Sequence, residues 1–286
     1  MRRDFAPLLI ETPHCAPVYC YQCPFGKEPE NRNLECVKDI EKVILQEGPE
    51  NVAAVFIESI TGSTAGTLIP HKDYLKQVRA LCDKYEVLFA VDEIMTGIGR
   101  TGKMFAIQHW DVKPDIICMA KGLSSGYAPL GAVGVKDFIH EGIKNGSGSF
   151  WHGFTYGNNP VSAAAGLAVL NYMEKHRLVE NSLTMGDYLI KKLQPLFNKY
   201  KAIGDIRGKG LMVGVEFVKD RETRKPFPPE LNLTNKILTQ AMNSGLMLYG
   251  SPLCINGYEG DAVMISPPLV VTEEEIDLII DLFDEV

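Results

Sequence analysis

Two short apolar runs, each ending in a charged side chain, constrain the fold of this 286-residue chain most strongly. Residues 88–92 (LFAVD) and 116–121 (IICMAK) have the continuous apolar character of buried parallel strands. In an open parallel sheet, the carboxyl ends of the strands line one crevice. We therefore expect Asp92, which ends the first run, and Lys121, which ends the second, to share one rim of a sheet.

The first half of the chain alternates strand and helix patterns. Asn33 can cap a helix whose apolar residues recur at helical spacing. Residues 53–57 (AAVFI) read as a further buried strand that ends at Glu58, and a helical stripe follows over 71–85. This alternation over residues 34–121 predicts an α/β fold with a doubly wound large domain.

The second half of the chain predicts a smaller α+β domain. A helix rich in small residues starts at Asn158–Pro160, and we place a domain boundary near residue 170, which gives domains 1–170 and 171–286. Beyond it we expect helices and short strands, and a capping box that begins at Thr272 opens the last helix. The helices are expected over 178–199 and 230–243, and the strands over 202–207, 211–218, 247–250 and 263–265.

Composition excludes several classes of protein. The net charge of −7 argues against a nucleic-acid surface, and no apolar run has the length of a membrane span. Seven cysteines fit reduced thiols, and hence a cytoplasmic location, better than a disulfide scaffold. Cys20 and Cys23 form a C-x-x-C pair, and other possible ligands (His14, Cys15, Cys36) are near in sequence. Because no second such pair exists, we favour a surface-crossing loop over a metal site.

An amine and a carboxylate on one rim suit a particular chemistry. A lysine can form an imine with a carbonyl compound, and an aspartate can hold the proton on a heteroaromatic nitrogen. Together Lys121 and Asp92 are the minimum equipment for pyridoxal phosphate chemistry. The plainer alternative is a lysine that reaches water after a buried strand and an acid that opens a solvated loop.

The surrounding motifs resemble the class III pyridoxal-phosphate aminotransferases, of fold type I. The match in order and spacing extends over nearly the whole chain. It is carried by residues 92–102 (DEIMTGIGRTG), 114–115 (PD), 120–122 (AKG), 129–132 (PLGA) and 152–156 (HGFTY).

The resemblance implies a role for each of five residues. Lys121 corresponds to the Schiff-base lysine and Asp92 to the partner of the pyridine nitrogen. Ile94 corresponds to the aliphatic residue that packs on the cofactor ring, and Glu58 to a polar contact near cofactor or substrate. Thr155 corresponds to the residue that reaches the cofactor phosphate of a neighbouring subunit, so a homodimer with shared sites is implied. The reaction would move an amino group from an amine donor to a keto-acid acceptor.

The chain departs from the family pattern in two ways. The family's amino-terminal part, with its phosphate-binding turn and ring-stacking aromatic, has no match upstream of residue 34. Met264 stands where many members carry an arginine for a substrate carboxylate, and Met95 where some carry glutamine. These methionines favour the branch that uses omega-amino acids or simple amines with pyruvate. A non-catalytic relic of the fold is a further alternative.

A second enzyme class competes for the same loop. Residues 97–102 (GIGRTG) satisfy G-x-G-x-x-G after a strand, which is the pattern of a dinucleotide (NAD-type) site. However, Asp92 and Glu93 would place two negative charges just ahead of a loop meant for a pyrophosphate. The next strand also ends in Lys121 rather than in an acid for a ribose hydroxyl.

Overall fold

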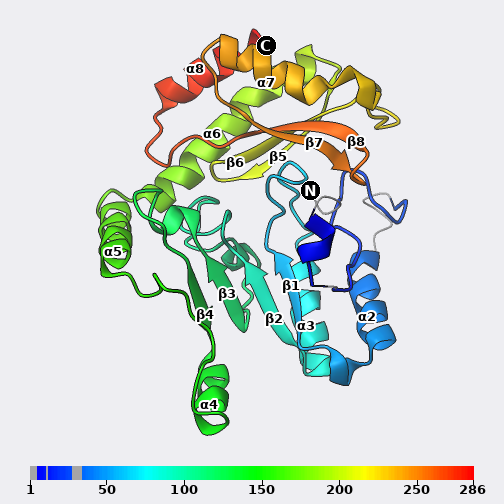
Figure 1. Ribbon diagram of the computed structural model, residues 1–286. Helices are drawn as coiled ribbons and strands as arrows, with labels where there is room; N and C mark the ends of the chain where they lie inside the picture. Colours follow the sequence, from blue (N-terminus) through cyan, green and yellow to red (C-terminus); the bar gives the residue numbers. More distant parts are fainter. Residues whose placement is uncertain (1–4, 11, 28–33) are drawn as a thin grey trace.

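Two four-stranded sheets dominate the computed structural model, which describes residues 5–10, 12–27 and 34–286 (Figure 1). The first sheet has the order β1-β2-β3-β4 and the second the order β5-β6-β8-β7. The strands are β1 (Ala54–Glu58), β2 (Leu88–Asp92), β3 (Ile116–Met119), β4 (Ala132–Val135), β5 (Ile203–Lys209), β6 (Met212–Phe217), β7 (Tyr249–Ile255) and β8 (Glu259–Ile265).

Helices surround both sheets. The α-helices are α2 (Glu35–Glu47), α3 (Tyr74–Tyr85), α4 (Asp137–Asn145), α5 (Pro160–Lys175), α6 (Leu178–Lys199), α7 (Leu233–Asn243) and α8 (Glu273–Asp284). Short 3-10 turns are η1 (Ala6–Leu8), η3 (Pro49–Asn51), η4 (Ala106–Trp110), η5 (Lys121–Leu123) and η6 (Pro229–Leu231). No helix within the described ranges is long and apolar enough to cross a membrane.

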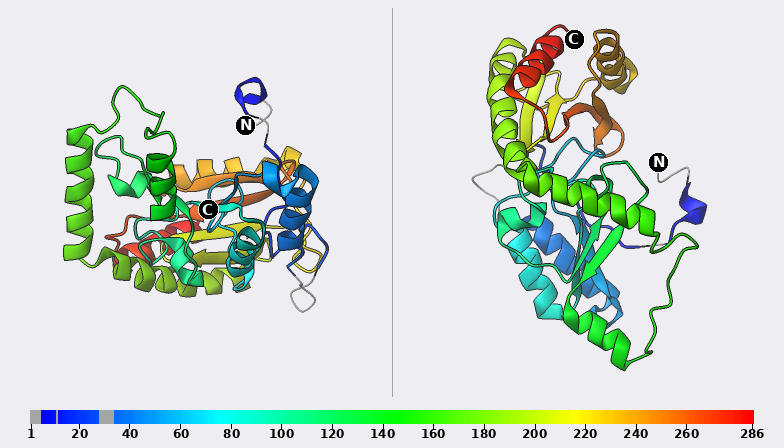
Figure 2. Two further views of the ribbon diagram at one scale, coloured as in Figure 1. Left: turned by 90° about the horizontal axis from the view of Figure 1, so that it is seen from below. Right: turned by 90° about the vertical axis from the view of Figure 1, so that its left-hand side faces the viewer.

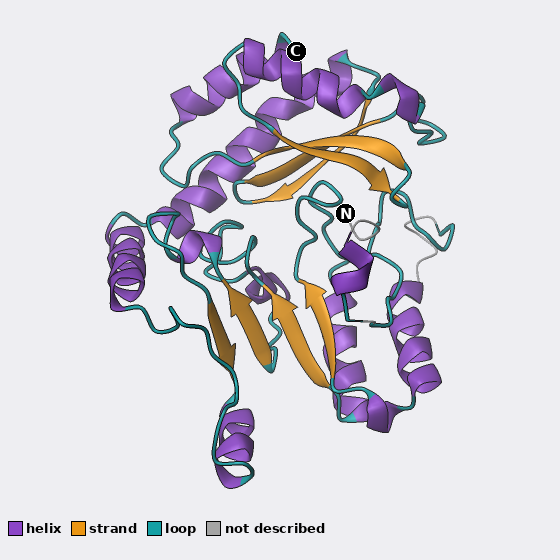
Figure 3. Cartoon of the chain, viewed as in Figure 1, coloured by secondary structure: helices purple, strands orange, loops and turns teal. Residues whose placement is uncertain are grey.

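The first sheet confirms the expected α/β class. Strands β1, β2 and β3 are parallel, and β4 is antiparallel to β3. The carboxyl ends of the three parallel strands point toward the second sheet (Figure 3). The continuous apolar sequence of β2 follows from its place inside the sheet, because Phe89 and Val91 are fully buried.

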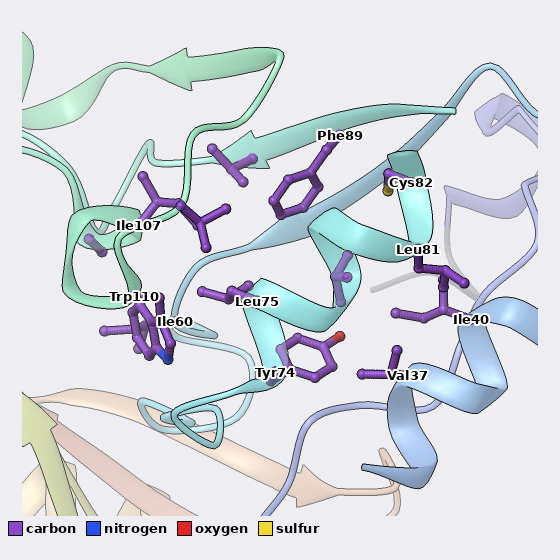
Figure 4. Close-up of a cluster of buried hydrophobic side chains, with 14 of the residues drawn as sticks. Val37, Ile40, Ile60, Tyr74, Leu75, Leu81, Cys82, Phe89, Ile107 and Trp110 are labelled. Carbon is purple, nitrogen blue, oxygen red and sulfur yellow. The ribbon is translucent and has the colours of Figure 1, made fainter. Parts of the chain in front are cut away.

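Helices α2 and α3 cover one face of the first sheet. Side chains of α3 fill the space between Phe89 of β2 and Val37 and Ile40 of α2 (Figure 4). Side chains alternate between faces along a strand, so Val55 and Ile57 join this core while Phe56 points the other way and is 58% exposed. The helical cover of β1 is therefore one-sided in the described chain.

The second sheet is antiparallel and forms its own layer with α6, α7 and α8 (Figure 2). Leu189 and Leu193 of α6 and Ile276 of α8 pack in its core. The predicted capping box opens α8, since the Thr272 hydroxyl accepts from the Glu275 N–H at 3.3 Å. We propose that the two sheets mark two domains, 1–170 and 171–286, with α5 crossing between them.

Several predicted boundaries differ from the structure. The helix expected over 71–85 begins at Tyr74, and the strands expected over 247–250 and 263–265 are longer, forming the pair β7 and β8. Asn33, expected to cap α2, lies outside the described residues, and Leu34 occupies the cap position.

Candidate active site

The strand register places the predicted acidic residues side by side. Asp92, the last residue of β2, pairs with Glu58 at the end of β1 and with Cys118 of β3. Neighbouring strands lie roughly 4.8 Å apart, so these three positions form one row across the rim. Lys121 follows two residues after β3 ends and begins η5. The structure therefore brings the three charged residues Glu58, Asp92 and Lys121 to the same edge of the sheet.

The electrostatic environment of Glu58 is consistent with this arrangement. Desolvation raises the pKa of Glu58, and a hydrogen bond from the Gly62 N–H to Oε1 (3.1 Å) opposes this shift. The negative charge of Asp92 raises the pKa of Glu58 further, while the positive charge of Lys121 lowers it. Both neighbours thus act on one carboxyl group.

Asp92 presents one oxygen for a ligand. Its Oδ1 accepts a hydrogen bond from the Ile94 N–H at 2.8 Å, which fixes the carboxylate and places Ile94 beside it. Within the described chain, no hydrogen bond occupies the other oxygen. Burial and then the Asp92 charge raise the pKa of the Cys118 thiol, so Asp92 also lies close to the strand that leads to Lys121.

Lys121 has an unusual backbone conformation. Its φ of +40° lies in the left-handed region, which is uncommon for a residue with a β-carbon. The side chain is exposed, and no ion pair holds its amine within the described residues. Backbone strain at a non-glycine residue concentrates at functional sites, so this conformation is consistent with a positioned amine.

Glu93 is a site residue that the sequence interpretation missed. It directly follows Asp92 and is fully buried, and it accepts four hydrogen bonds from the surrounding loops. The sequence pattern showed only a second acid after a strand. No local signal distinguished its buried side chain from a solvated one.

The G-x-G-x-x-G loop packs against the C-terminal half of the chain. No helix opens at this loop, as a dinucleotide fingerprint requires, because residues 95–104 form turns. A β-carbon on Gly99 would lie 2.9 Å from Met173 Cε, and one on Gly102 would lie 2.8 Å from Leu183 Cβ. Arg100 donates to the carbonyls of Leu211 (2.9 Å) and Pro267 (2.6 Å), and burial lowers its pKa to about 10. These glycines therefore serve close packing, and nothing here supports the NAD interpretation.

In the described chain, no hydrogen bond or ion pair joins the remaining predicted residues to this row. Thr155 is exposed in the segment between α4 and α5, and no hydrogen bond joins it to the site within the described chain. Met264 is 1% exposed and packs with Met212 in the core beside the first sheet. Met95 lies near Glu58. The N–H of Gly62 binds Glu58, and a β-carbon on Gly62 would lie 2.8 Å from the Met95 sulfur.

The cysteine pair lines a small cavity. Cys20, Cys23, Cys36 and His71 line this cavity among apolar side chains. Across the described ranges, no three histidine, cysteine or acidic side chains are arranged to hold a metal ion, and no disulfide joins the cysteines.

Comparisons with known proteins agree with this geometry. The Aminotransferase class-III family model matches residues 1–286. The Bacillus subtilis aminotransferase YodT, described as uncharacterised, is 39% identical over 285 residues, which cover 99% of this chain and 64% of that protein. The taurine–pyruvate aminotransferase of Bilophila wadsworthia is 35% identical, with coverage of 98% and 61%.

Solved structures show the same fold. A thermostable (S)-enantioselective omega-transaminase from Thermomicrobium roseum superimposes with a TM-score of 0.89 at 34% identity, covering 100% of this chain and 62% of that one. The chain thus spans less than two thirds of the length of these relatives. Its whole-chain family match and the shared fold nevertheless agree: the chain belongs to the class III aminotransferases, of the pyridoxal-phosphate-dependent fold type I.

Proposed function

We propose that this protein transfers amino groups from an amine donor to a keto acid with pyridoxal 5′-phosphate as cofactor. The observation that carries the proposal is that Glu58, Asp92 and Lys121 lie at the same edge of the sheet, at or just beyond the carboxyl ends of three adjacent strands. Family membership supports the same chemistry.

The residues present fit this cofactor. The unoccupied oxygen of Asp92 suits the protonated ring nitrogen, and Lys121 offers an exposed amine for the aldehyde carbon. Ile94, fixed beside Asp92, would pack on the ring face, and Glu58 would contact the cofactor or substrate from the neighbouring strand. Thr155 would hold the phosphate of the cofactor in a second copy of the chain, which its exposed position permits.

The mechanism divides proton handling between an amine and a carboxylate. When bound, pyridoxal phosphate supplies an electron-poor ring that accepts the electrons left on a deprotonated carbon. The Nζ atom of Lys121 would remove the proton from the donor carbon that bears the amino group, as a general base, and would deliver a proton to the carbonyl carbon of the keto-acid acceptor, as a general acid. Asp92 would accept a hydrogen bond from the protonated ring nitrogen and hold that proton in place. Because Lys121 has no ion-pair partner in the described chain, its amine is not held away from the substrate.

The donor class follows from two methionines. Met264 is buried and carries no charge, so it cannot bind a second carboxylate of a diacid substrate. Met95 adds another apolar side chain near Gly62. We therefore propose omega-amino acids or simple amines as donors and pyruvate as acceptor. A taurine–pyruvate aminotransferase and an omega-transaminase among the relatives support this choice. We also propose a cytoplasmic homodimer.

A product assay tests the proposed reaction. The protein is incubated with pyridoxal phosphate, pyruvate and a panel of omega-amino acids and simple amines, and alanine formation is measured. We expect alanine with the wild type and a loss of at least about 10²-fold in Lys121→Ala, since a positioned acid-base group contributes that much. Equal alanine formation by wild type and variant would contradict the assignment.

A further inference from the structure

Glu93 is the most deeply buried acid near the proposed site, with 0% of its surface exposed. We propose that Glu93 is a positioning residue that ties together the ends of the three strands that carry Glu58, Asp92 and Lys121. This inference rests on the proposed function. It adds a residue that touches neither substrate nor cofactor but fixes the groups that do.

The side chain of Glu93 gathers donors from three segments. Its Oε1 accepts from the Ser59 hydroxyl at 2.6 Å and the Ile107 N–H at 2.8 Å. Its Oε2 accepts from the Thr96 hydroxyl at 2.5 Å and the Ala106 N–H at 3.0 Å. No cation pairs with it in the part of the chain that the structure describes. Hydrogen bonds alone therefore compensate the free-energy cost of burying the Glu93 carboxylate. The position of each donor is important for this reason.

Backbone hydrogen bonds of Glu93 complete the connection between the strand ends. Its N–H donates to the Cys118 carbonyl of β3 at 2.9 Å, and its carbonyl accepts from the Gly97 N–H at 3.0 Å. Ser59 directly follows Glu58, and Cys118 precedes Lys121 by three residues. One residue thus joins β1 through its side chain, β2 through the chain itself and β3 through its N–H.

A glutamine at this position cannot replace the carboxylate. The Ile107 N–H and the Ala106 N–H can only donate, and they bind different oxygens. An amide has one oxygen, so in Glu93→Gln one of these N–H groups faces an NH₂ group and is left unsatisfied. Hydroxyls can rotate to adapt, but backbone N–H groups cannot.

Asp115 offers a matched control at the opposite end of the same strands. It is also a buried acid and immediately precedes β3. Its carboxylate accepts from the Phe89 N–H at 2.8 Å, from Arg79 at 2.6 Å and from Lys136 at 2.7 Å. Asp115→Asn therefore weakens a comparable set of hydrogen bonds to a buried carboxylate. It does so at the end of the strands opposite to Glu58, Asp92 and Lys121.

Hydrogen exchange tests this connection between the strand ends in the absence of cofactor. Exchange is followed by mass spectrometry in peptides covering 58–63, 92–97 and 118–122. We expect Glu93→Gln to speed exchange in these three peptides more than in the rest of the chain, and Asp115→Asn to change them no more than the rest of the chain. Ser59→Ala removes only the link to β1, so it should affect 58–63 alone and serves if Glu93→Gln does not fold. Unchanged exchange at the three ends, or the same change in both acid variants, would overturn the proposal.

Cofactor binding gives the second readout. Misplacement of reacting groups by about 1 Å costs up to about 10²-fold, so we expect Glu93→Gln to weaken pyridoxal phosphate binding about tenfold or more. Asp115→Asn should change it less than about twofold, well under that tenfold effect. If both variants weaken cofactor binding equally, Glu93 contributes to stability and does not position the site residues. If the wild type shows no binding that depends on Lys121, the proposed function fails, whereas the exchange pattern still decides the role of Glu93.

Discussion

Asp92 and Lys121 show how far single residues could be predicted. Their common rim followed from two apolar runs that end in charged residues, because parallel strands in one sheet align their carboxyl ends. The role of Glu93 could not be predicted in this way. Its four partners come from segments up to 34 residues away in sequence, and only the folded chain brings them to one carboxylate.

Asp92→Asn tests the proposed ring partner. The amide cannot keep a proton on the ring nitrogen as a carboxylate does, so amino transfer should fall by about 10²–10⁴-fold. Steady-state kinetics of alanine formation measures the change. Asp111→Asn, at an exposed acid after η4, is the control and should match the wild type. Activity of Asp92→Asn within a factor of about two of the wild type would contradict the assigned role.

The ionisation of Asp115 should make the free energy of unfolding fall as the pH becomes acidic. Desolvation would raise its pKa, but hydrogen bonds from Lys136, the Phe89 N–H and Arg79 outweigh this effect and lower it. A lowered folded-state pKa stabilises the protein above the unfolded value of about 3.9, and this contribution is lost as the pH falls through the folded value.

The corresponding measurement is urea unfolding of wild type and Asp115→Asn between pH 7 and pH 2. Hydrogen bonds to a charged group contribute about 1.5–3 kcal/mol, so the variant should be less stable by that order at pH 7. The difference should shrink as the pH falls below about 4, where the Asp115 carboxylate of the unfolded chain begins to be protonated, and should vanish below the lower folded-state pKa. A difference that stays constant down to pH 2 would show that the charge of Asp115 contributes nothing.

At the scale of elements, the helices and central strands were predicted well and the edge of the second sheet was not. The sequence indicated a strand over 247–250, directly before Ser251 and Pro252. Strand β7 lies at the sheet edge, where a proline without an N–H is tolerated, and therefore continues to Ile255. Strand β8 begins at Glu259, before the predicted residue 263, and its buried Asp261 accepts from the N–H and hydroxyl of Thr234.

The glycine loop and the turn between β5 and β6 should be intolerant of side chains. Gly210 has φ +53°, and a β-carbon there would lie 2.4 Å from the Thr101 carbonyl carbon. We expect Gly210→Ala to destabilise the protein by about 1–2 kcal/mol from backbone strain plus about 1–3 kcal/mol from overpacking.

Gly245→Ala is the matched control for this prediction. Gly245 has φ +86°, but nothing lies within 4 Å of an added β-carbon. An alanine there should therefore cost only backbone strain and no overpacking. Thermal and urea unfolding of both variants measures the difference. Equal destabilisation would show that the loop does not need close packing at Gly210 and would reopen a ligand-binding role for residues 97–102.

At the scale of the whole molecule, contacts between the halves could not be read from the sequence. Buried Glu216 of β6 accepts from the Tyr19 hydroxyl and from Gln22 at 3.0 Å, nearly 200 residues earlier in the chain. Arg207 of β5 binds Glu216 at 2.6 Å and also donates to the Gly66 carbonyl at 2.9 Å. Periodicity reports which face of an element is apolar but not which distant segment covers it.

Subunit mixing tests the proposed shared site. If Thr155 acts on the cofactor of a second copy, Lys121→Ala and Thr155→Val subunits should complement each other, because a mixed dimer contains one intact site. A 1:1 mixture that exchanges freely should recover about a quarter of wild-type activity, since half the dimers are mixed and each has one intact site of two. Sedimentation should show a species of twice 31.7 kDa. An active monomer, or no recovery on mixing, would contradict the shared site.

The pairing of Lys121 with a cofactor held by Asp92 is tested most directly by an absorbance scan of the purified protein with added pyridoxal phosphate. After free cofactor has been removed, we predict that a band near the visible edge stays with the wild type, since an imine with Lys121 retains the cofactor and its conjugated ring, and that no such band stays with Lys121→Ala. Identical spectra for wild type and variant would contradict the central claim.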